Sequence, residues 1–301
     1  MIAEFPNFKK IELTDKEEID GLTKKYPPYS DFEFGSLWAW DVKEEMAISV
    51  LNDNLVVKFT DYTTGNPFLA FLGENEVDAT TESLLSYSRE NNFEETLHLI
   101  PETVAKELDR ELFVVEESRD HFDYVCDINR HIEYPGKKLK SQRNLLRTFT
   151  DTSPDFEMVS LAMETKEAQQ EVAGVLRRWS TEKGFITDSE AFAYDRFVAG
   201  AASLSYSAVG IRVGTDLVAF HIVSLPPGNC ANALFGKADT TYRGVYAALD
   251  HVVARDLLSR NYTHMNIQQD LGIEGLRAAK LSLHPSHLLK KYSVKSANNP
   301  Q

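Results

Sequence analysis

The stretch that decides the fold is Asn266–His287, NIQQDLGIEGLRAAKLSLHPSH. A β-type run ends near Asn266, Asp270-Leu271-Gly272 has the composition of a turn, and a helical pattern follows it. Arg277 and Lys280 are three residues apart, so a helix places them on one face. Two cations close to a helix start predict a site for a phosphate or carboxylate, although a solvated cationic face has the same spacing.

A second patterned segment, Lys137–Thr150, lies upstream. Its first eleven residues contain five cations and no acidic residue. At about 100° per residue, a helix gathers Leu139, Leu145, Leu146 and Phe149 on one side, and Lys140, Arg143 and Arg147 on the other, with Asn144 beside them. A phosphate backbone, of RNA or of lipid head groups, is the natural partner of such a face. The alternative is a solvated helix surface built from good helix formers.

Around these two segments the chain alternates between strand and helix patterns. In the second half, the expected helices are Lys166–Glu182, Ser189–Ala202, Val245–Ser259 and Ile273–Leu283, and the expected strands are Ser205–Val213, Asp216–Leu225, Asn229–Lys237 and Tyr262–Ile267. In the first half, helices are expected at Asp15–Lys25 and Val77–Asn92, and strands at Met46–Leu51, Leu55–Thr60, Pro67–Leu72, Leu112–Val115 and Phe122–Cys126.

This order predicts a mixed α/β (α+β) protein of two tandem units, near residues 1–133 and 134–301. The order of the second half is that of a GNAT-type acyltransferase fold, and the first half has a looser version of it. We expect a central sheet flanked by helices in each unit. In the second unit we expect a splayed strand pair near Ala219 and Lys237.

Charge is distributed unevenly along the chain. The net charge is −14, but residues 1–133 hold 30 acidic and 12 basic residues, whereas residues 134–301 hold 16 acidic and 20 basic ones. The second half is therefore the part expected to meet an anionic partner. With two cysteines, no basic-then-apolar leader pattern and no apolar run long enough to span a bilayer, the sequence predicts a cytoplasmic protein without a transmembrane segment.

The candidates for acid–base chemistry are carboxylates. Glu190 and Asp270 are the best placed to accept a proton from an attacking nucleophile, and for each the alternative is structural: a first-turn helix acid and a turn residue. His221 lies inside an apolar strand pattern, which is typical of a core histidine. No spacing of His, Cys or acidic residues predicts a metal site, and no nucleophile–histidine arrangement indicates covalent catalysis.

The segment Tyr242-Arg243-Gly244-Val245-Tyr246, followed by a helix, is a weak match to the glycine-rich turn that holds the pyrophosphate of acyl-CoA in GNAT enzymes. An ordinary strand-to-helix turn has the same composition. A binding role for Arg243, Gly244 and Tyr246 and a purely structural one both remain open at this point.

Taken together, these segments resemble the phosphatidylglycerol lysyltransferase C-terminal domain family. Its closing signature matches Asp270-Leu271-Gly272, Gly275-Leu276-Arg277, Lys280, Ser282, Pro285 and Lys291-Tyr292. Further matches are Gly136-Lys137-Lys138, Arg143-Asn144, Phe149, Trp179, Glu190, Ala219-Phe220, Lys237-Ala238 and Tyr242–Tyr246. The family often has acidic residues before Asp-Leu-Gly, where this chain has Gln268 and Gln269.

The resemblance implies transfer of an aminoacyl or acyl group to an amine or hydroxyl. The donor would be aminoacyl-tRNA or acyl-CoA, no cofactor would be required, and tRNA or an anionic small molecule or lipid head group would be the partner. A catalytically silent anion-binding module of the same fold is the alternative. We expect the site in a cleft between the units, with Glu190 and Asp270 as candidate catalytic groups. The expected substrate-binding residues are Lys137, Lys138, Arg143, Asn144, Lys237, Arg243, Gly244, Tyr246, Asn266, Arg277 and Lys280.

Overall fold

The fold is known from a computed structural model that describes residues 1–42, 44–61, 65–183 and 188–297, the side chains of 182, 183 and 188 excepted. Contacts within the chain define two compact units. Unit 1 comprises Met1–Asp123, Gln269–Glu274 and the chain from Leu288 onward, and unit 2 comprises Tyr124–Gln268 and Gly275–His287. The division at residue 133 expected from the sequence treats each unit as one continuous segment, whereas here the chain returns twice to unit 1.

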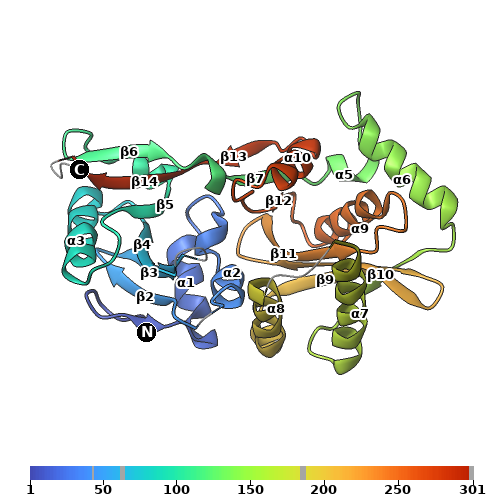
Figure 1. The fold of residues 1–301 in the computed structure, drawn as a ribbon, viewed down its shortest axis with the longest axis horizontal. Coiled ribbons are helices and arrows are strands. Elements are labelled where there is room, and N and C mark those ends of the chain that lie inside the picture. Colours follow the sequence, from blue (N-terminus) through green and yellow to red (C-terminus); the bar gives the residue numbers. More distant parts are fainter. Residues whose placement is uncertain (43, 62–64, 184–187, 298–301) are drawn as a thin grey trace. The chain divides into compact units, whose positions relative to one another are not determined.

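A seven-stranded sheet, in the order β13-β7-β12-β11-β10-β9-β8, forms the centre of unit 2 (Figure 1). Its strands are β7 (Asp123–Asp127), β8 (Glu157–Ser160), β9 (Tyr206–Val213), β10 (Asp216–Ser224), β11 (Cys230–Ala238), β12 (His264–Asn266) and β13 (His287–Leu289). The strands β8 to β11 pair antiparallel, and β11 and β12 pair parallel. The β7 strand, expected in the N-terminal unit, is thus a strand of the unit 2 sheet from Tyr124 onward.

Helices cover both faces of this sheet (Figure 1). On one face lie α7 (Lys166–Lys183), which packs on β10 and β11, and α8 (Asp188–Gly200), whose Tyr194 contacts Phe235 of β11. On the other face lies α9 (Val245–Ser259), which packs on β9, β10 and β11 and carries α5 (Arg130–Glu133) and α6 (Lys140–Thr152) on its outer side. The helix α10 (Glu274–Ser282) follows β12.

The amphipathic pattern of α6 is confirmed. Leu139 and Phe149 are fully buried, and Leu145 and Leu146 pack against the core, whereas Lys140, Arg143 and Arg147 are exposed. In α9, buried side chains recur at helical spacing, so that Val245, Leu249, Val252 and Leu257 meet the sheet. These two helices therefore stack in layers, with α9 between α6 and the sheet.

The splayed strands differ from those expected. Ala219 and Lys237 belong to β10 and β11, which stay paired from Ala219 to Ser224. The strands that separate are β11 and β12: their parallel register ends at Asn232 and Asn266, while β11 continues to Ala238. The order of strands along the sequence thus identified the sheet, but not the pair of strands that separate.

Unit 1 contains two smaller sheets where one was expected. The first is antiparallel, in the order β1 (Lys9–Lys10), β2 (Ala47–Leu51), β3 (Asn54–Thr60) and β4 (Pro67–Leu72). The β2–β3 hairpin turns at Asn52 and Asp53, which both have positive φ, a conformation that Asn and Asp tolerate better than most residues. The second sheet has the order β5 (Leu97–Pro101), β14 (Lys291–Ser296) and β6 (Phe113–Glu117). Helices α1 (Lys16–Thr23), α2 (Phe34–Ala39), α3 (Val77–Glu90) and α4 (Glu102–Ala105) complete the unit.

A buried ion cluster ties the C-terminal strand of unit 1 to its N-terminal part. Lys291 of β14 is fully buried and pairs with Asp31 and with Asp123, whose oxygen lies 2.7 Å from the ammonium. Ser30 donates to Asp123 from both its backbone and its hydroxyl, each at 2.8 Å. Burial alone would lower the pKa of Lys291, but the two carboxylates raise it, so the ammonium stays charged. Lys291 thus has a structural role in unit 1.

Candidate functional site

Two pockets lie within unit 2. The first, which we call the α9 pocket, has a volume of about 380 Å³ and is formed by α6, the start of α9 with its preceding turn, and α10. Its lining includes Gln142, Tyr242, Tyr246, Asp250, Lys280 and Leu283. The second, which we call the α7–α8 pocket, has a volume of about 520 Å³ and is lined by α7, α8 and β11. Because α9 and the α7–α8 pair cover opposite faces of the sheet, the two pockets open on opposite sides of unit 2.

Gly244 directly precedes α9, lines the α9 pocket and lies against the backbone of α6. It has φ +87°, and a β-carbon built on it would lie 2.1 Å from the carbonyl oxygen of Leu145. Only glycine fits there, because any side chain would meet both the unfavourable φ and the α6 backbone. The Tyr242–Tyr246 turn, whose sequence weakly matches a pyrophosphate-binding turn, is therefore in direct contact with α6.

Asp250 lies one helical turn beyond Tyr246 and lines the same pocket. Among the described residues, no hydrogen bond or ion pair holds its carboxylate. Burial raises the pKa of Asp250 from 3.8 to about 7. Asp250 is not predictable from the sequence, because an acid flanked by Leu249 and His251 inside an apolar helix carries no motif.

Lys280 and Arg277 share α10, as the spacing predicts, but only Lys280 is among the residues that line the α9 pocket. The Lys280 ammonium donates to the carbonyl of Ile267 at 2.6 Å and lies 5.9 Å from the centre of the Tyr124 ring. Arg277 is half-buried on the same helix. Asn266 is fully buried at the end of β12, where its side-chain oxygen accepts from the backbone N–H of Gln268 at 2.7 Å.

The opening between β11 and β12 is bridged by a side chain. Gln268 follows β12, and its amide nitrogen donates to the carbonyl of Ala233, just past the point where the strands separate, at 2.5 Å. Gln268 has φ +62°, an uncommon backbone conformation for a residue with a side chain. One of the two adjacent glutamines, Gln268, thus occupies a backbone acceptor in the gap.

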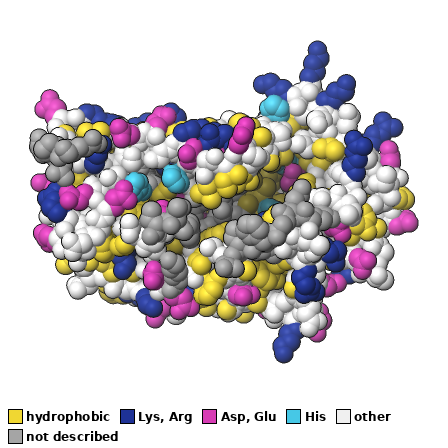
Figure 2. All heavy atoms as spheres, in the orientation of Figure 1, with side chains coloured by type: hydrophobic (Ala, Val, Ile, Leu, Met, Phe, Trp, Pro, Cys, Tyr) yellow, Lys and Arg dark blue, Asp and Glu magenta, His cyan; other side chains and the backbone are white. Residues whose placement is uncertain are grey.

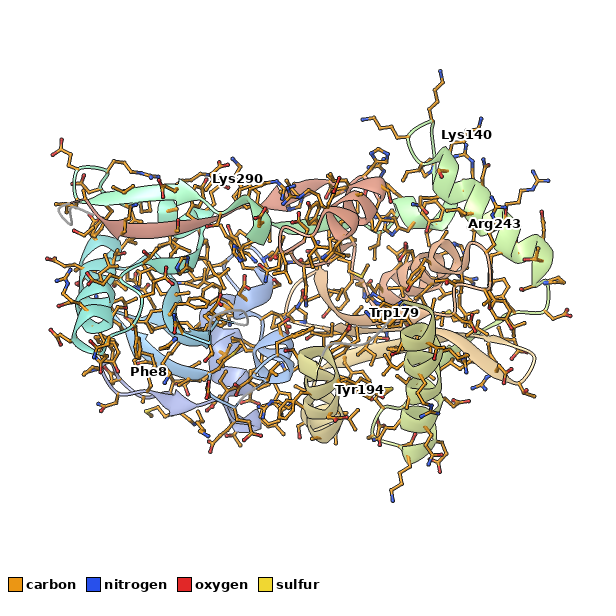
Figure 3. All side chains as sticks on the ribbon, in the orientation of Figure 1. Phe8, Lys140, Trp179, Tyr194, Arg243 and Lys290 are labelled. Atoms are coloured by element: carbon orange, nitrogen blue, oxygen red, sulfur yellow. The ribbon has the colours of Figure 1, made fainter. Side chains whose placement is uncertain are left out.

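Glu190 lies in the α7–α8 pocket together with Lys237. Their side chains form an ion pair of 2.8 Å, and the Lys237 ammonium lies 4.2 Å from the centre of the Trp179 ring. Figure 3 shows Trp179 on α7 and Tyr194 on α8, the helices that frame this pocket. The sequence-predicted Glu190, Lys237 and Trp179 are thus brought together, and the carboxylate already has a cation as partner.

Asp270 belongs to unit 1 and is fully buried. Its carboxylate pairs with Arg119 at 3.1 Å and accepts the backbone N–H of Gly272 at 2.9 Å. This is the turn-stabilising role that was weighed against a catalytic one, and Asp270 is not among the residues that line either pocket of unit 2.

The remaining predicted binding residues form an exposed basic surface. We define the α6 basic surface as the exposed cations Lys137, Lys138, Lys140, Arg143 and Arg147. Arg143 also caps the local backbone by donating to the carbonyls of Tyr134 and Gly136, and Arg147 lies 3.5 Å from Asp151. Asn144 and Arg243 are exposed too. Figure 2 shows cationic side chains projecting from the end of unit 2 that carries α6, and Figure 3 labels Lys140 and Arg243 there.

Neither a metal nor a membrane span is indicated. Over the described ranges, no three His, Cys, Asp or Glu side chains are grouped so as to hold a metal ion. In the same part of the chain, the helices fall short of the length and apolar character needed to cross a bilayer.

The fold is similar to that of FemX. The structure of FemX matches with a TM-score of 0.58 at 10% identity, over 95% of this chain and 96% of that one. A crystal structure from Bacteroides thetaiotaomicron, titled as a conserved protein of unknown function, matches with a TM-score of 0.83 at 26% identity, over 98% and 99% of the two chains.

The chain belongs to the family described as phosphatidylglycerol lysyltransferase, C-terminal, whose model matches residues 23–295. L-PGS from Bacillus licheniformis matches with a TM-score of 0.63 at 13% identity, over all of this chain and 95% of that one. The C-terminal domain of a putative lysylphosphatidylglycerol synthetase from Agrobacterium fabrum matches with a TM-score of 0.68 at 12% identity, over 96% and 93%. No curated protein matches the chain in sequence.

Proposed function

We propose that this protein transfers an aminoacyl group from a charged tRNA to an amine or hydroxyl acceptor, and that the α9 pocket is where the transfer takes place. One observation supports the proposal: the same helix, α6, contributes to a basic surface for tRNA and to the wall of the pocket. The outward side of α6 and the turn that precedes it present the α6 basic surface, while Gln142 and Leu145 of α6 line the α9 pocket. A tRNA phosphate backbone on that surface would bring its aminoacylated end to the mouth of the pocket.

The size and lining of the pocket suit such a substrate. Its volume of about 380 Å³ falls in the range of roughly 300–1,000 Å³ typical of small-molecule sites. Tyr242 and Tyr246 offer aromatic surface for a base or ribose, and Lys280 offers an ammonium near the pocket wall. Excluding water and orienting the two reactants supply much of the acceleration that an acyl transfer needs.

The α6 helix also argues for tRNA over acyl-CoA. In the acyl-CoA hypothesis, the amides of the turn at Gly244 would hold a pyrophosphate. The Leu145 carbonyl oxygen lies close to the α-carbon of Gly244, where its partial negative charge would oppose a pyrophosphate, and Gln268 occupies the Ala233 carbonyl between the separated strands. A charged tRNA needs neither the backbone amides of the turn nor the gap, because its phosphates would bind outside the pocket.

Replacement of Lys137, Lys138 and Lys140 by Ala tests the proposal. Because each phosphate contact contributes to the release of counterions, the variant should bind charged tRNA more weakly. The slope of log affinity against log salt should fall by about 2–3. Binding is measured with total tRNA charged with radiolabelled amino acids.

The matched control carries Lys10, Lys24 and Lys166 to Ala, three exposed cations elsewhere with the same change in net charge. This control should bind as the wild type does. Equal loss in both variants would mean that only net charge matters, and tight binding of acyl-CoA without binding of tRNA would transfer the proposal to the acyl-CoA alternative.

A further inference from the structure

Three carboxylates of this chain are candidates for acid–base chemistry, because each matches a motif or lines a pocket. They differ in the groups that they pair with. Glu190 is paired with Lys237 at 2.8 Å, and Asp270 is paired with Arg119 at 3.1 Å. A carboxylate fixed by a cation is a weak base, because protonation would break the pair. Among the described residues, the Asp250 carboxylate has no such partner, yet it lines the α9 pocket.

The groups around Asp250 leave its carboxylate able to accept a proton. Lys280 from α10 and Tyr242 and Tyr246 from the start of α9 line the same pocket, and α6 contributes the neutral Gln142 and Leu145. Behind the helix are Cys126 of β7 and Tyr134, whose hydroxyl donates to the carbonyl of Ala247 at 2.9 Å. Burial, and to a lesser degree the nearby Asp250 charge, raises the pKa of the Cys126 thiol to about 12, so the thiol stays neutral.

We propose that Asp250 is the catalytic proton acceptor of the α9 pocket, taking the proton from the amine or hydroxyl that attacks the aminoacyl ester. This inference rests on the proposed function. It assigns a residue that lies outside the family signature Asp270–Tyr292 and outside every motif of the sequence analysis.

The step balances without any further reactant. The lone pair of the acceptor nitrogen or oxygen forms a bond to the ester carbonyl carbon, and the nucleophile's proton passes to the Asp250 carboxylate. The ester bond to the tRNA ribose then breaks, and the proton moves from Asp250 to the departing ribose oxygen. The new amide or ester, the free tRNA and the ionised carboxylate are the products. A base whose pKa lies near 7 can both take and return a proton near neutral pH.

Asp250→Asn tests this assignment, because the amide keeps the shape of the side chain but cannot accept the proton. The probe is total tRNA charged with radiolabelled amino acids, with ethanolamine as a simple acceptor. We measure protein-dependent loss of label from tRNA under single-turnover conditions. We expect the variant to lose about 10²–10⁴-fold in rate while binding charged tRNA as before. The Asp250→Glu variant should recover part of the rate.

A pH profile separates a proton acceptor from a structural residue. The wild-type rate should rise with pH up to about 7, as Asp250 ionises, and this limb should be missing from the residual rate of Asp250→Asn. Asp216→Asn, which removes an exposed acid at the start of β10, is the control for the loss of one negative charge.

The possible results distinguish a failure of the Asp250 assignment from a failure of the proposed function. If Asp250→Asn transfers the label at the wild-type rate, the assignment of Asp250 is overturned while aminoacyl transfer stands. If the wild type neither binds nor deacylates charged tRNA, the proposed function is overturned and the assignment with it. Loss of rate that appears together with an equal loss of tRNA binding also overturns the assignment, because it makes Asp250 a binding residue.

Discussion

The two pockets of unit 2 contain similar kinds of residues but arrange them differently. In the α7–α8 pocket, Glu190 and Lys237 neutralise each other and the Trp179 ring covers the ammonium. In the α9 pocket, the Asp250 carboxylate forms no ion pair among the described residues, and burial makes its ionised form unfavourable. The first arrangement satisfies its charges within the protein. The second leaves a reactive group for a ligand.

This difference teaches that a sequence motif and a reactive site need not coincide. Glu190, Lys237 and Trp179 are matches to a family pattern: Glu190 and Lys237 form an ion pair, and the Trp179 ring lies against the Lys237 ammonium, so that contacts join α7, α8 and β11. Asp250 belongs to no pattern, yet its environment opposes its ionisation, which is typical of groups that exchange protons during catalysis. The side chains that surround a carboxylate decide its role more than the type of acidic residue does.

Blocking each pocket with a bulky side chain should give the largest difference between them. Ala279 and Ala191 are both exposed helix alanines, one lining the α9 pocket and the other lining the α7–α8 pocket. We expect Ala279→Trp to lower the transfer rate by about a hundredfold or more, because a displaced substrate loses its alignment. Ala191→Trp is the matched control and should change the rate less than about threefold, a difference of under ~0.7 kcal/mol.

Thermal melting of both variants checks that the fold persists. If Ala191→Trp abolishes transfer while Ala279→Trp leaves it intact, the roles of the two pockets must be exchanged.

The stability of Asp250→Asn should depend on pH in a way that reports the cost of the buried charge. Below about pH 4 the carboxyl is protonated in both the folded and the unfolded protein, so the variant gains nothing. As pH rises toward 7, the unfolded chain loses its proton first, and wild-type stability falls until both states are ionised. A shift of three pKa units corresponds to about 4 kcal/mol, and we expect about 2 kcal/mol because the pocket admits water.

The variant should therefore melt at a higher temperature than the wild type at pH 8 and at the same temperature at pH 4. Denaturation at the two pH values measures this, with Asp216→Asn as the control that should show no such dependence. A variant less stable than the wild type at pH 8 would mean that Asp250 has a stabilising partner.

Glu190→Gln should have the opposite sign and the smallest effect. Removing the carboxylate leaves the Lys237 ammonium, which is 16% exposed, without its ionic partner. We expect a loss of about 1 kcal/mol in the free energy of unfolding, since the pair is only partly shielded from water. The transfer rate should fall less than tenfold. A larger loss of rate with unchanged stability would make Glu190 a catalytic group and would weaken the contrast between the pockets.

Much of the fold could be predicted from periodicity. The strands β3 and β4 and the helices α3 and α9 lie within two residues of their expected bounds, because each combines a regular apolar pattern with clear ends. The strands β5 and β14 were missed, and both pair within unit 1. Short strands such as Leu97–Pro101 carry little pattern of their own, and the return of residues 291–296 to unit 1 depends on the buried Lys291 cluster, which local sequence does not specify.

The site was predictable only in part. The spacing of Arg277 and Lys280 and the basic face of α6 follow from helical geometry, and the structure places Lys280 and the Tyr242–Tyr246 turn in one pocket. Lys280 lines a pocket built from unit 2 alone, and the cleft expected between the units stays a prediction. Whether a carboxylate meets a cation depends on tertiary contacts, so the pairings of Glu190 and Asp270 and the isolation of Asp250 required the structure.

The central claim is that the aminoacyl end of a charged tRNA enters the α9 pocket, and photo-crosslinking tests it most directly. The protein is irradiated with tRNA that carries a photoreactive amino acid, and the crosslinked peptides are identified by mass spectrometry. The account predicts crosslinks within residues 240–250 and 279–283, which line the α9 pocket. Crosslinks confined to residues 173–181 and 190–195, on the helices of the α7–α8 pocket, would contradict it.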